Sequence, residues 1–251
     1  MASGLMSIDT YALLAKNYDL LMKDIPYQRW LDFISVFAGK IRKTGVRIVD
    51  AGCGTGTVAL GLLQRGFMVT GLDRSAEMLS LARMKADQLD LTLPLLQGDF
   101  SDMQLDTDMV ISTCDGINHL LACRDVIKFF RRAHACLSPG GCLLFDINTE
   151  YLYRRILADN VFAWGIQELD LVWRNQYVAP INYVEIDMYT PLGKGCWSKA
   201  NFSIIQRCHQ VSTLIYYLEQ TGFRLEGLWE NYGRRRITHT AQRITFVAHK
   251  L

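Results

Sequence analysis

The sequence of 251 residues predicts an α/β protein with a seven-stranded, mostly parallel sheet, helices on both faces and an inserted antiparallel β subdomain. Between residues 46 and 148, apolar strand-like runs alternate with helical segments, which is typical of parallel strands joined by right-handed crossovers. Residues 149–207 interrupt this alternation with short aromatic and β-branched segments separated by Pro and Gly. We therefore expect a core formed by residues 1–148 and 208–251, and an insertion formed by residues 149–207.

The core elements follow from hydrophobic periodicity. Residues 9–44 are expected to be helical, with a break at Pro26, because their apolar residues recur at spacings of three and four. The alternating region then predicts strands at 46–51, 67–72, 93–97, 109–114 and 141–147, and helices at 56–66, 76–88 and 123–137. A helix over 209–221 and strands over 225–230 and 243–249 complete the core.

Four segments of the insertion are predicted strands, at 161–164, 169–173, 183–189 and 200–205. The insertion leaves the core directly after the fifth strand. Ligands of open α/β sheets bind at the carboxyl ends of the strands. We therefore expect the insertion to cover a ligand site at that edge and its aromatic residues to contribute to substrate recognition.

The most informative motif is Val-Asp-Ala-Gly-Cys-Gly-Thr-Gly at residues 49–56, between the first parallel strand and its helix. Its glycines let the backbone turn sharply and let a ligand lie against it. A dinucleotide fingerprint would need glycine at position 57, where this chain has Thr57, and a P-loop would need Gly-Lys-Ser/Thr. Asp50 places a carboxylate where a cationic amine can be held and a pyrophosphate cannot. This favours S-adenosylmethionine over a dinucleotide.

Acidic residues follow the next two strands. Asp73 ends the second strand and can accept hydrogen bonds from both ribose hydroxyls of an adenosine, a need that NAD and S-adenosylmethionine share. Asp99 and Phe100 follow the third strand and combine a carboxylate for the adenine amino group with an apolar ring. Residues 114–118 follow the fourth strand. Because these strand ends meet at one edge of a parallel sheet, they predict a single cofactor site.

Taken in order, these motifs resemble those of class I S-adenosylmethionine-dependent methyltransferases from about residue 45 to residue 148. The N-terminus is similar to that of a bacterial small-molecule methyltransferase group in Tyr18-Asp19-Leu20-Leu21-Met22, Ile25-Pro26-Tyr27 and Trp30. Met78, Asp115, Asn118 and Gly222-Phe223 fit the same pattern. The resemblance implies a Rossmann-like core, S-adenosyl-L-methionine as cofactor and methyl transfer. It is specific for cofactor and fold but not for substrate.

The resemblance also implies a set of cofactor-binding residues. N-terminal helices should lie over the methionine end of the cofactor, with Tyr18 as a hydroxyl contact and Trp30 as a further candidate, although their helical spacing also fits packing. Met78 should pack on adenine, and Cys53 should fill space beside the cofactor, with a nucleophilic role as the alternative. The expected set is Tyr18, Trp30, Asp50, Gly52, Cys53, Gly54, Asp73, Arg74, Met78, Asp99, Phe100 and Cys114.

Two histidines are the catalytic candidates. His119 follows the fourth strand, where a methyl acceptor approaches the sulfonium, so it is a candidate general base; a hydrogen-bonded structural histidine is the alternative. His209 either caps the 209–221 helix or faces the pocket. Asp115 and Asn118 are candidates for orienting the acceptor, although Asp115-Gly116 also fits a turn. In-line methyl transfer needs mainly alignment and water exclusion, with a base only for a protonated acceptor.

Composition limits the other classes of function. The net charge is only +2, half of the residues are apolar and 21% are charged, which does not favour a nucleic-acid partner. The basic cluster at residues 234–236 is too short to change this. No apolar stretch approaches the roughly 20 residues of a membrane span, and the N-terminus lacks a signal-peptide pattern. We therefore expect no membrane association.

Seven cysteines without Cys-x-x-Cys spacing indicate reduced thiols and neither a zinc nor a dithiol site. The sequence thus predicts a cytoplasmic monomer or homodimer without a metal that methylates an N or O atom of a small molecule. An RNA or protein methyltransferase, a nicotinamide oxidoreductase and a non-catalytic binding protein with the same fold are the alternatives.

Overall fold

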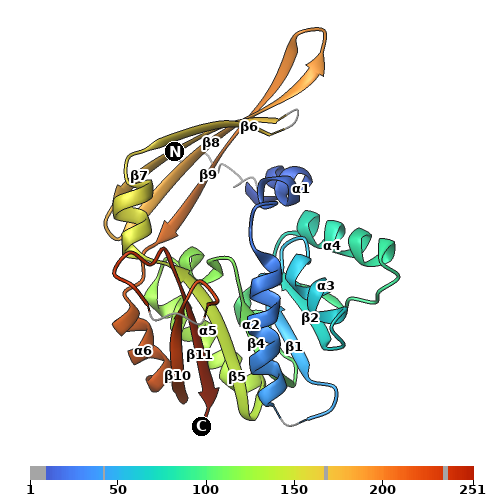
Figure 1. The fold of residues 1–251 in the computed structure, drawn as a ribbon, viewed down its shortest axis with the longest axis vertical. Coiled ribbons are helices and arrows are strands. Elements are labelled where there is room, and N and C mark those ends of the chain that lie inside the picture. The colour runs from blue at the N-terminus through green and yellow to red at the C-terminus, as the bar shows by residue number, and fades with distance from the viewer. Residues whose placement is uncertain (1–9, 42, 167–168, 234–236) are drawn as a thin grey trace, which may run out of the picture.

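The computed structural model describes residues 10–41, 43–166, 169–233 and 237–251. Its larger sheet has seven strands in the order β10-β11-β5-β4-β1-β2-β3 (Figure 1). These strands are β1 (Arg47–Ala51), β2 (Met68–Asp73), β3 (Leu95–Gln97), β4 (Thr107–Ser112), β5 (Leu137–Asn148), β10 (Phe223–Glu230) and β11 (Arg243–Lys250). Strand β11 is antiparallel to both neighbours, and β1 to β5 pair in parallel. The predicted mostly parallel sheet is confirmed.

Helices cover both faces of this sheet, because the buried strands carry apolar side chains on both faces. On one face, α2 (Tyr27–Lys40), α3 (Thr57–Leu63) and α4 (Ala76–Gln88) pack on a core that includes Ile48, Ile111 and Leu144. On the other, α5 (Cys123–Cys136) and α6 (Val211–Gln220) pack on a core that includes Val49, Val110 and Phe145. Neighbouring residues of one strand thus belong to different cores.

The insertion forms a separate antiparallel sheet in the order β6-β7-β8-β9. Its strands are β6 (Val161–Ile166), β7 (Leu169–Val178), β8 (Ile181–Gly193) and β9 (Cys196–Arg207), and the π-helical turn η3 (Leu152–Leu157) precedes them. The strands β8 and β9 are longer than the sequence predicted, and their hairpin extends beyond the rest of the sheet (Figure 1).

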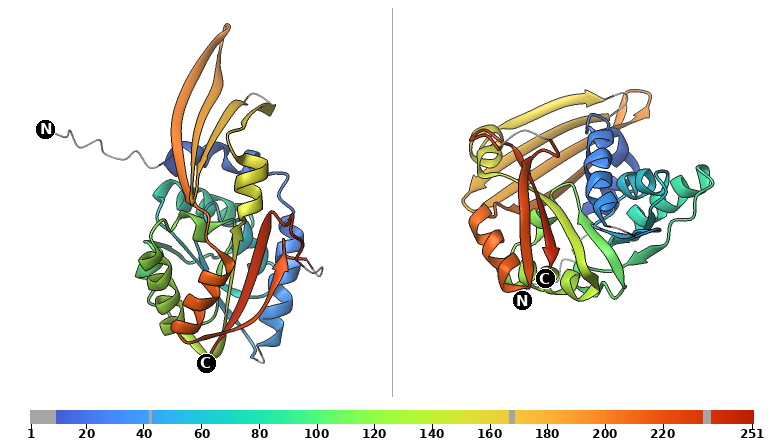
Figure 2. Two further views of the ribbon diagram at one scale, coloured as in Figure 1. Left: turned by 90° about the vertical axis from the view of Figure 1, so that its left-hand side faces the viewer. Right: turned by 60° about the horizontal axis from the view of Figure 1, so that its bottom comes forward.

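Helix α1 (Thr10–Leu21) lies between the insertion and the core, as both views in Figure 2 show. Its Leu14 and Ala15 pack with Met78 of α4 and with Leu171, Ile186 and other apolar residues of the insertion. One apolar cluster therefore joins three parts of the chain that are far apart in sequence, and it fixes the insertion above the core.

Asp108 at the start of β4 holds the opposite end of the sheet together. Its carboxylate is 2% exposed and accepts hydrogen bonds from Lys43 Nζ at 2.9 Å, from Arg47 Nη2 at 3.1 Å and from Ser138 Oγ at 3.0 Å. Burial opposes ionisation, but the hydrogen bonds from Arg47 and Lys43 outweigh it and hold the pKa of Asp108 well below its usual range. The charged form of Asp108 therefore stabilises the fold.

We expect Asp108→Asn to lower the free energy of unfolding at pH 7 by on the order of 2 kcal/mol, because charge-assisted hydrogen bonds are lost. The pKa of Asp108 is depressed in the folded state, so its contribution is complete above the unfolded-state pKa of about 4 and is lost as the pH falls. Urea denaturation of both proteins at pH 7 and pH 3 checks this. A difference that grows toward pH 3 would contradict it.

No helix among the described residues is long and apolar enough to cross a membrane. The described residues also contain no cluster of His, Cys, Asp and Glu side chains that could hold a metal ion.

Candidate functional site

The glycine motif forms the turn from β1 to α3. Gly52, Gly54 and Gly56 have φ angles of 80°, 54° and 77°, in the left-handed region that favours glycine. A Cβ added at Gly54 would meet no atom within 4 Å, so this residue presents bare backbone to open space. A Cβ at Gly52 would lie 3.2 Å from the ring of Phe100. The motif therefore leaves an open backbone surface against which a ligand can lie.

A cavity opens at this surface, at the carboxyl ends of β1, β2 and β4 and beside the turn after β3. It is lined by Tyr18, Gly52, Gly54, Leu72, Asp73, Arg74, Met78, Gly98, Asp99, Phe100, Thr113, Cys114, Gly116, His119 and Leu120. The structure thus brings together the whole predicted cofactor set except Trp30, Asp50 and Cys53, and it adds the catalytic candidate His119.

Asp73 is anchored at the end of β2 by backbone groups. Its Oδ2 accepts the Gly54 N–H at 2.8 Å, and its Oδ1 accepts the Ser75 N–H at 2.9 Å. A carboxylate oxygen can accept more than one hydrogen bond. Asp73 is therefore suited to hold a pair of hydroxyls next to the glycine turn.

Helix α1 is attached above the same turn. Asp19 accepts a hydrogen bond from Thr55 Oγ1 at 2.5 Å and forms an ion pair with Lys85 Nζ at 2.7 Å. The neighbouring Tyr18 lines the cavity, and its hydroxyl lies 3.8 Å from Cys114 Sγ. The N-terminal helix therefore contributes to the wall of the cavity, and the predicted contact of the Tyr18 hydroxyl with the cofactor stays a prediction.

Three predicted cofactor residues lie behind the cavity wall. Trp30 is 1% exposed and stacks on Tyr232 at 4.7 Å between ring centroids. Cys53 packs against Gly71, where an added Cβ would lie 2.8 Å from the sulfur, and burial raises the pKa of the thiol well above its usual value. The structure thus places Trp30 in packing contact with Tyr232 and Cys53 in packing contact with Gly71. A neutral Cys53 thiol does not suit the nucleophilic alternative, and the contacts of Trp30 and Cys53 with the cofactor stay predictions.

Asp50 is the third of these residues, and it is 1% exposed. Burial, together with the nearby Asp73, raises the pKa of Asp50 to about 7. The backbone N–H of Ala59 lowers the pKa of Asp50 in part. Its geometry is not that of a normal hydrogen bond, and neither carboxylate oxygen of Asp50 has such a partner among the described residues. The structure therefore places this carboxylate beneath the glycine turn, and its predicted contact with a cationic amine stays a prediction.

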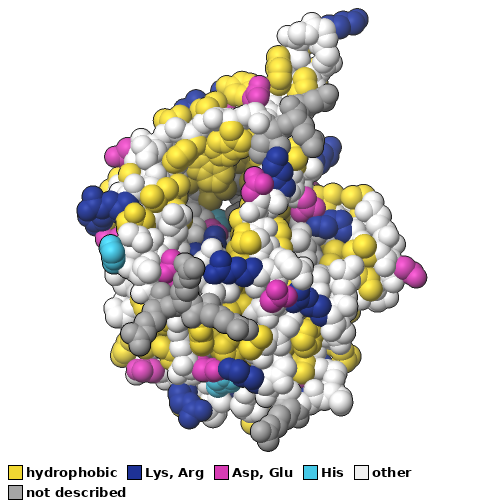
Figure 3. Space-filling model, viewed as in Figure 1, with side chains coloured by type: hydrophobic (Ala, Val, Ile, Leu, Met, Phe, Trp, Pro, Cys, Tyr) yellow, Lys and Arg dark blue, Asp and Glu magenta, His cyan; other side chains and the backbone are white. Residues whose placement is uncertain are grey.

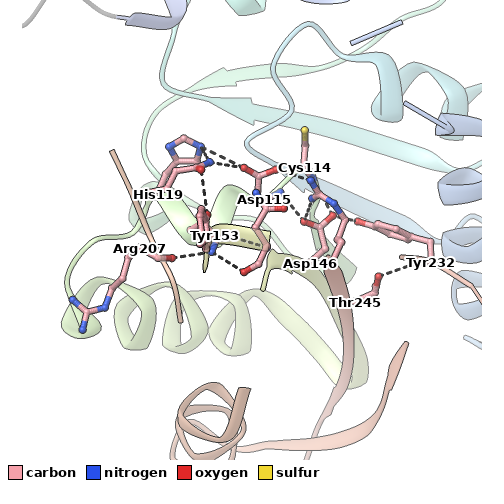
Figure 4. Close-up of polar contacts among 12 residues, drawn as sticks. Cys114, Asp115, His119, Asp146, Tyr153, Arg207, Tyr232 and Thr245 are labelled. Carbon is pink, nitrogen blue, oxygen red and sulfur yellow. Dashed lines mark hydrogen bonds and ion pairs between the residues drawn. The ribbon is translucent and has the colours of Figure 1, made fainter. Parts of the chain in front are cut away.

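A buried ionic network supports the far wall of the cavity (Figure 4). Arg243 of β11 binds Asp146 Oδ1 at 2.5 Å and Asp115 Oδ1 at 2.9 Å. Asp146 also accepts the N–H groups of Cys114 at 3.0 Å and of Asp115 at 2.6 Å, and the hydroxyl of Tyr232. This network fixes the loop that follows β4, which carries His119 in the short helix η2 (Gly116–His119).

The two catalytic candidates differ in their surroundings. His119 lines the cavity and is hydrogen-bonded through Nε2 to Gln206 of β9 at 3.3 Å. His209 is 5% exposed, and its Nε2 lies 3.1 Å from the carbonyl oxygens of Ile117 and Leu120. Burial lowers the pKa of His209 to about 4. His209 therefore secures η2 and does not line the cavity, which does not agree with its predicted catalytic role.

The sequence pattern does not reveal the network members that come from distant segments, namely Asp146, Tyr232 and Arg243, nor Gln206 beside His119. One signal was present in the sequence. Asp146 interrupts an otherwise apolar strand, and a charge in a buried strand requires a partner.

Comparisons with known proteins concern the class of this chain. A family model described as a methyltransferase domain matches residues 48–141. A putative methyltransferase from Geobacillus sp. (strain WCH70) is 29% identical over 246 residues, which cover 96% of this chain and 100% of the relative. The putative methyltransferase YqeM from Bacillus subtilis (strain 168) is 29% identical over 243 residues, which cover 96% and 97%.

Among solved structures, an S-adenosylmethionine-dependent methyltransferase from Clostridium acetobutylicum ATCC 824 superimposes with a TM-score of 0.87 at 24% identity, covering 96% of this chain and 99% of that one. Fold, glycine turn and whole-length relatives agree. Residues 48–141 form a methyltransferase domain, and the chain is an S-adenosylmethionine-dependent methyltransferase. The predicted cofactor, S-adenosylmethionine, is confirmed with it.

The cavity fits this cofactor chemically. The uncovered backbone at Gly54 and the anchored Asp73 suit a ribose, and the apolar side chains of Met78, Leu72 and Phe100 suit a flat purine. When bound, S-adenosylmethionine supplies an electrophilic methyl group whose leaving group is a neutral thioether. The protein has to hold the cofactor, exclude water and present the acceptor in line.

We expect Asp73→Ala to weaken S-adenosylhomocysteine binding by about 100-fold. Two charge-assisted hydrogen bonds to the ribose are lost, each worth about 1.5–3 kcal/mol, and water that replaces the carboxylate compensates for part of this loss. Asp87→Ala on the exposed surface of α4 is the matched control. Isothermal titration calorimetry measures affinity, and circular dichroism verifies the fold. Equal affinities for both variants would place the ribose elsewhere.

Proposed function

We propose that this enzyme transfers the methyl group to an N or O atom of a small molecule bound between the cavity and the insertion. The observation that carries this proposal is the contact at 3.3 Å between Gln206 of the insertion and His119, which lines the cavity. Figure 3 shows a hollow beneath the insertion with hydrophobic side chains on its upper wall. In this proposal, residues 149–207 recognise the acceptor, and residues 1–148 with 208–251 hold the cofactor.

The strand register assigns the aromatic residues of the insertion to two faces. Phe162 pairs with Trp173 and Trp164 pairs with Leu171, which is buried against α1, so these residues share the face toward the core. Tyr183 neighbours Val184 on β8 and lies on the opposite face, with 44% of its surface exposed. Only part of the aromatic set is therefore available to an acceptor beneath the insertion.

His119 is the candidate proton acceptor for the reaction. Burial lowers the pKa of His119, Asp115 raises it in part, and Arg74 lowers it further. The net effect keeps the ring neutral at pH 7, which is the form that accepts a proton from an ammonium or hydroxyl group. Asp115, held by Arg243, lies 4.0 Å from His119 Nε2 and is suited to stabilise the ring once it is protonated.

Two proteins with related sequence or fold are described by a sugar acceptor and by a biosynthetic reaction. The sugar N-methyltransferase KedS8 from Streptoalloteichus sp. ATCC 53650 superimposes with a TM-score of 0.75 at 18% identity, covering 100% of this chain and 98% of that one. A ubiquinone biosynthesis O-methyltransferase from Roseobacter denitrificans is 29% identical over 133 residues, or 48% of this chain and 50% of that protein. They support a small acceptor and leave open the choice between nitrogen and oxygen.

Incubation of the enzyme with methyl-labelled S-adenosylmethionine and a bacterial extract tests the proposal. The extract is separated into small molecules, RNA and protein after the reaction. The label should enter the small-molecule fraction with the wild-type enzyme and fall at least tenfold with His119→Asn. Label in RNA or protein alone would contradict a small-molecule acceptor.

We expect Trp173→Ala to raise the KM for the acceptor found in this way by about tenfold, since an aromatic contact contributes about 0.5–1.5 kcal/mol beyond area burial. The affinity for S-adenosylhomocysteine should not change. Tyr183→Ala, on the opposite face of the same sheet, is the matched control and should leave KM unchanged. Steady-state kinetics and calorimetry check both. Loss of cofactor affinity in Trp173→Ala would show that the insertion does not act on the acceptor alone.

A further inference from the structure

Gln206 links the insertion to the catalytic side of the cavity. It lies near the end of β9, pairs with Asn182 in the sheet and is 9% exposed. Its Nε2 donates a hydrogen bond to Asp115 Oδ2 at 2.6 Å, and its Oε1 accepts one from the hydroxyl of Tyr153 at 3.1 Å. Gln206 thus reaches from the insertion to both Asp115 and His119.

The orientation of the Gln206 amide follows from its partners. Asp115 is ion-paired with Arg243 at 2.9 Å, so its carboxylate only accepts hydrogen bonds. The amide nitrogen must therefore face Asp115, and the amide oxygen must face Tyr153. Burial raises the pKa of Tyr153 well above its usual value, so its hydroxyl remains a donor. Both contacts require the same orientation of the amide.

This orientation determines the state of His119. The amide nitrogen of Gln206 has two hydrogens, of which one is donated to Asp115. The second is available to His119 Nε2 at 3.3 Å. A ring nitrogen that receives an N–H must be unprotonated, so the proton of the neutral ring is on Nδ1. If Nε2 of His119 were protonated, its N–H would face the N–H of Gln206, and no hydrogen bond could form between them.

We propose that Gln206 is a positioning residue that holds His119 in the Nδ1–H tautomer, so that His119 accepts a proton only when the methyl acceptor replaces the Gln206 amide at Nε2. This inference rests on the proposed function of His119. The proton leaves the heteroatom of the acceptor for Nε2, while the electron pair of the broken N–H or O–H bond remains on the heteroatom for attack on the methyl carbon. The resulting imidazolium lies beside Asp115.

The consequence is that the position of the insertion and the availability of the base are linked. Gln206 belongs to the insertion, whereas His119 and Asp115 belong to the loop after β4. An acceptor that does not reach Nε2 leaves the base hydrogen-bonded. The charged groups that act on the ring are Asp115, which favours its protonation, and Arg74, which opposes it.

Long-range ¹H–¹⁵N NMR of the full chain saturated with S-adenosylhomocysteine tests the inference, with His119→Asn to assign the ring signals. The wild-type ring should show the Nδ1–H tautomer and remain neutral at pH 6.5. Gln206→Met removes the donor, so we expect the Nε2–H tautomer directed at Asp115 and a pKa of His119 higher than in the wild type. Gln176→Met, at an exposed glutamine of β7, is the control and should match the wild type.

An Nε2–H tautomer in the wild-type protein would overturn the inference without any variant. An unchanged ring spectrum in Gln206→Met with an unchanged thermal unfolding midpoint would also overturn it. The labelling experiment with His119→Asn tests the role of His119 as base separately. Full labelling by His119→Asn would refute the proposed base, whereas the NMR result would still report the contact between His119 and Gln206.

Discussion

The ion pairs of the buried Arg243 with Asp146 and Asp115 are the interaction on which the rest of the site depends. Asp146 has no exposed side-chain surface, and the side chain of Arg243 is 15% exposed. An unpaired charge in such a position costs about 3–5 kcal/mol. Cys114 and Asp115 have φ angles of 58° and 54°, which non-glycine residues rarely adopt, and Asp146 holds them there by accepting both N–H groups. The charge pairing therefore shapes the cavity wall.

The base of the insertion is fastened to this same loop. The Asn118 side chain donates to the carbonyl oxygens of Asn148 and Arg207 at 3.3 and 2.8 Å, at the two points where the chain leaves and re-enters the core. His209 secures the other side of η2. The insertion is thus placed by contacts at its base and by α1 along its length, and His119 lies where both restraints meet.

Much of this arrangement could be predicted from the sequence, because it is encoded locally. The glycine turn, Asp73 and Asp99 each follow a strand whose end is determined by the parallel sheet, and the order of motifs identified the cofactor. The network around Arg243 could not be predicted, since its members at 115, 146, 206 and 243 meet only after the chain folds. Trp30 and His209 show the converse limit. Their positions in the sequence suggest contact with a ligand. The same positions also suit buried residues, and in the structure Trp30 packs on another ring while His209 binds backbone carbonyl groups.

The central claim is that the bare backbone at Gly54 is the surface on which the cofactor lies. Calorimetric titration of S-adenosylhomocysteine into wild-type protein and into Gly54→Val tests it most directly, because a Cβ added at Gly54 meets no protein atom within 4 Å and Gly54 lines the cavity. The left-handed backbone adds about 1–2 kcal/mol of strain, so circular dichroism must show that the variant is folded. We expect tight binding to the wild type and no measurable binding to the folded variant. Equal binding of S-adenosylhomocysteine to both proteins would contradict it.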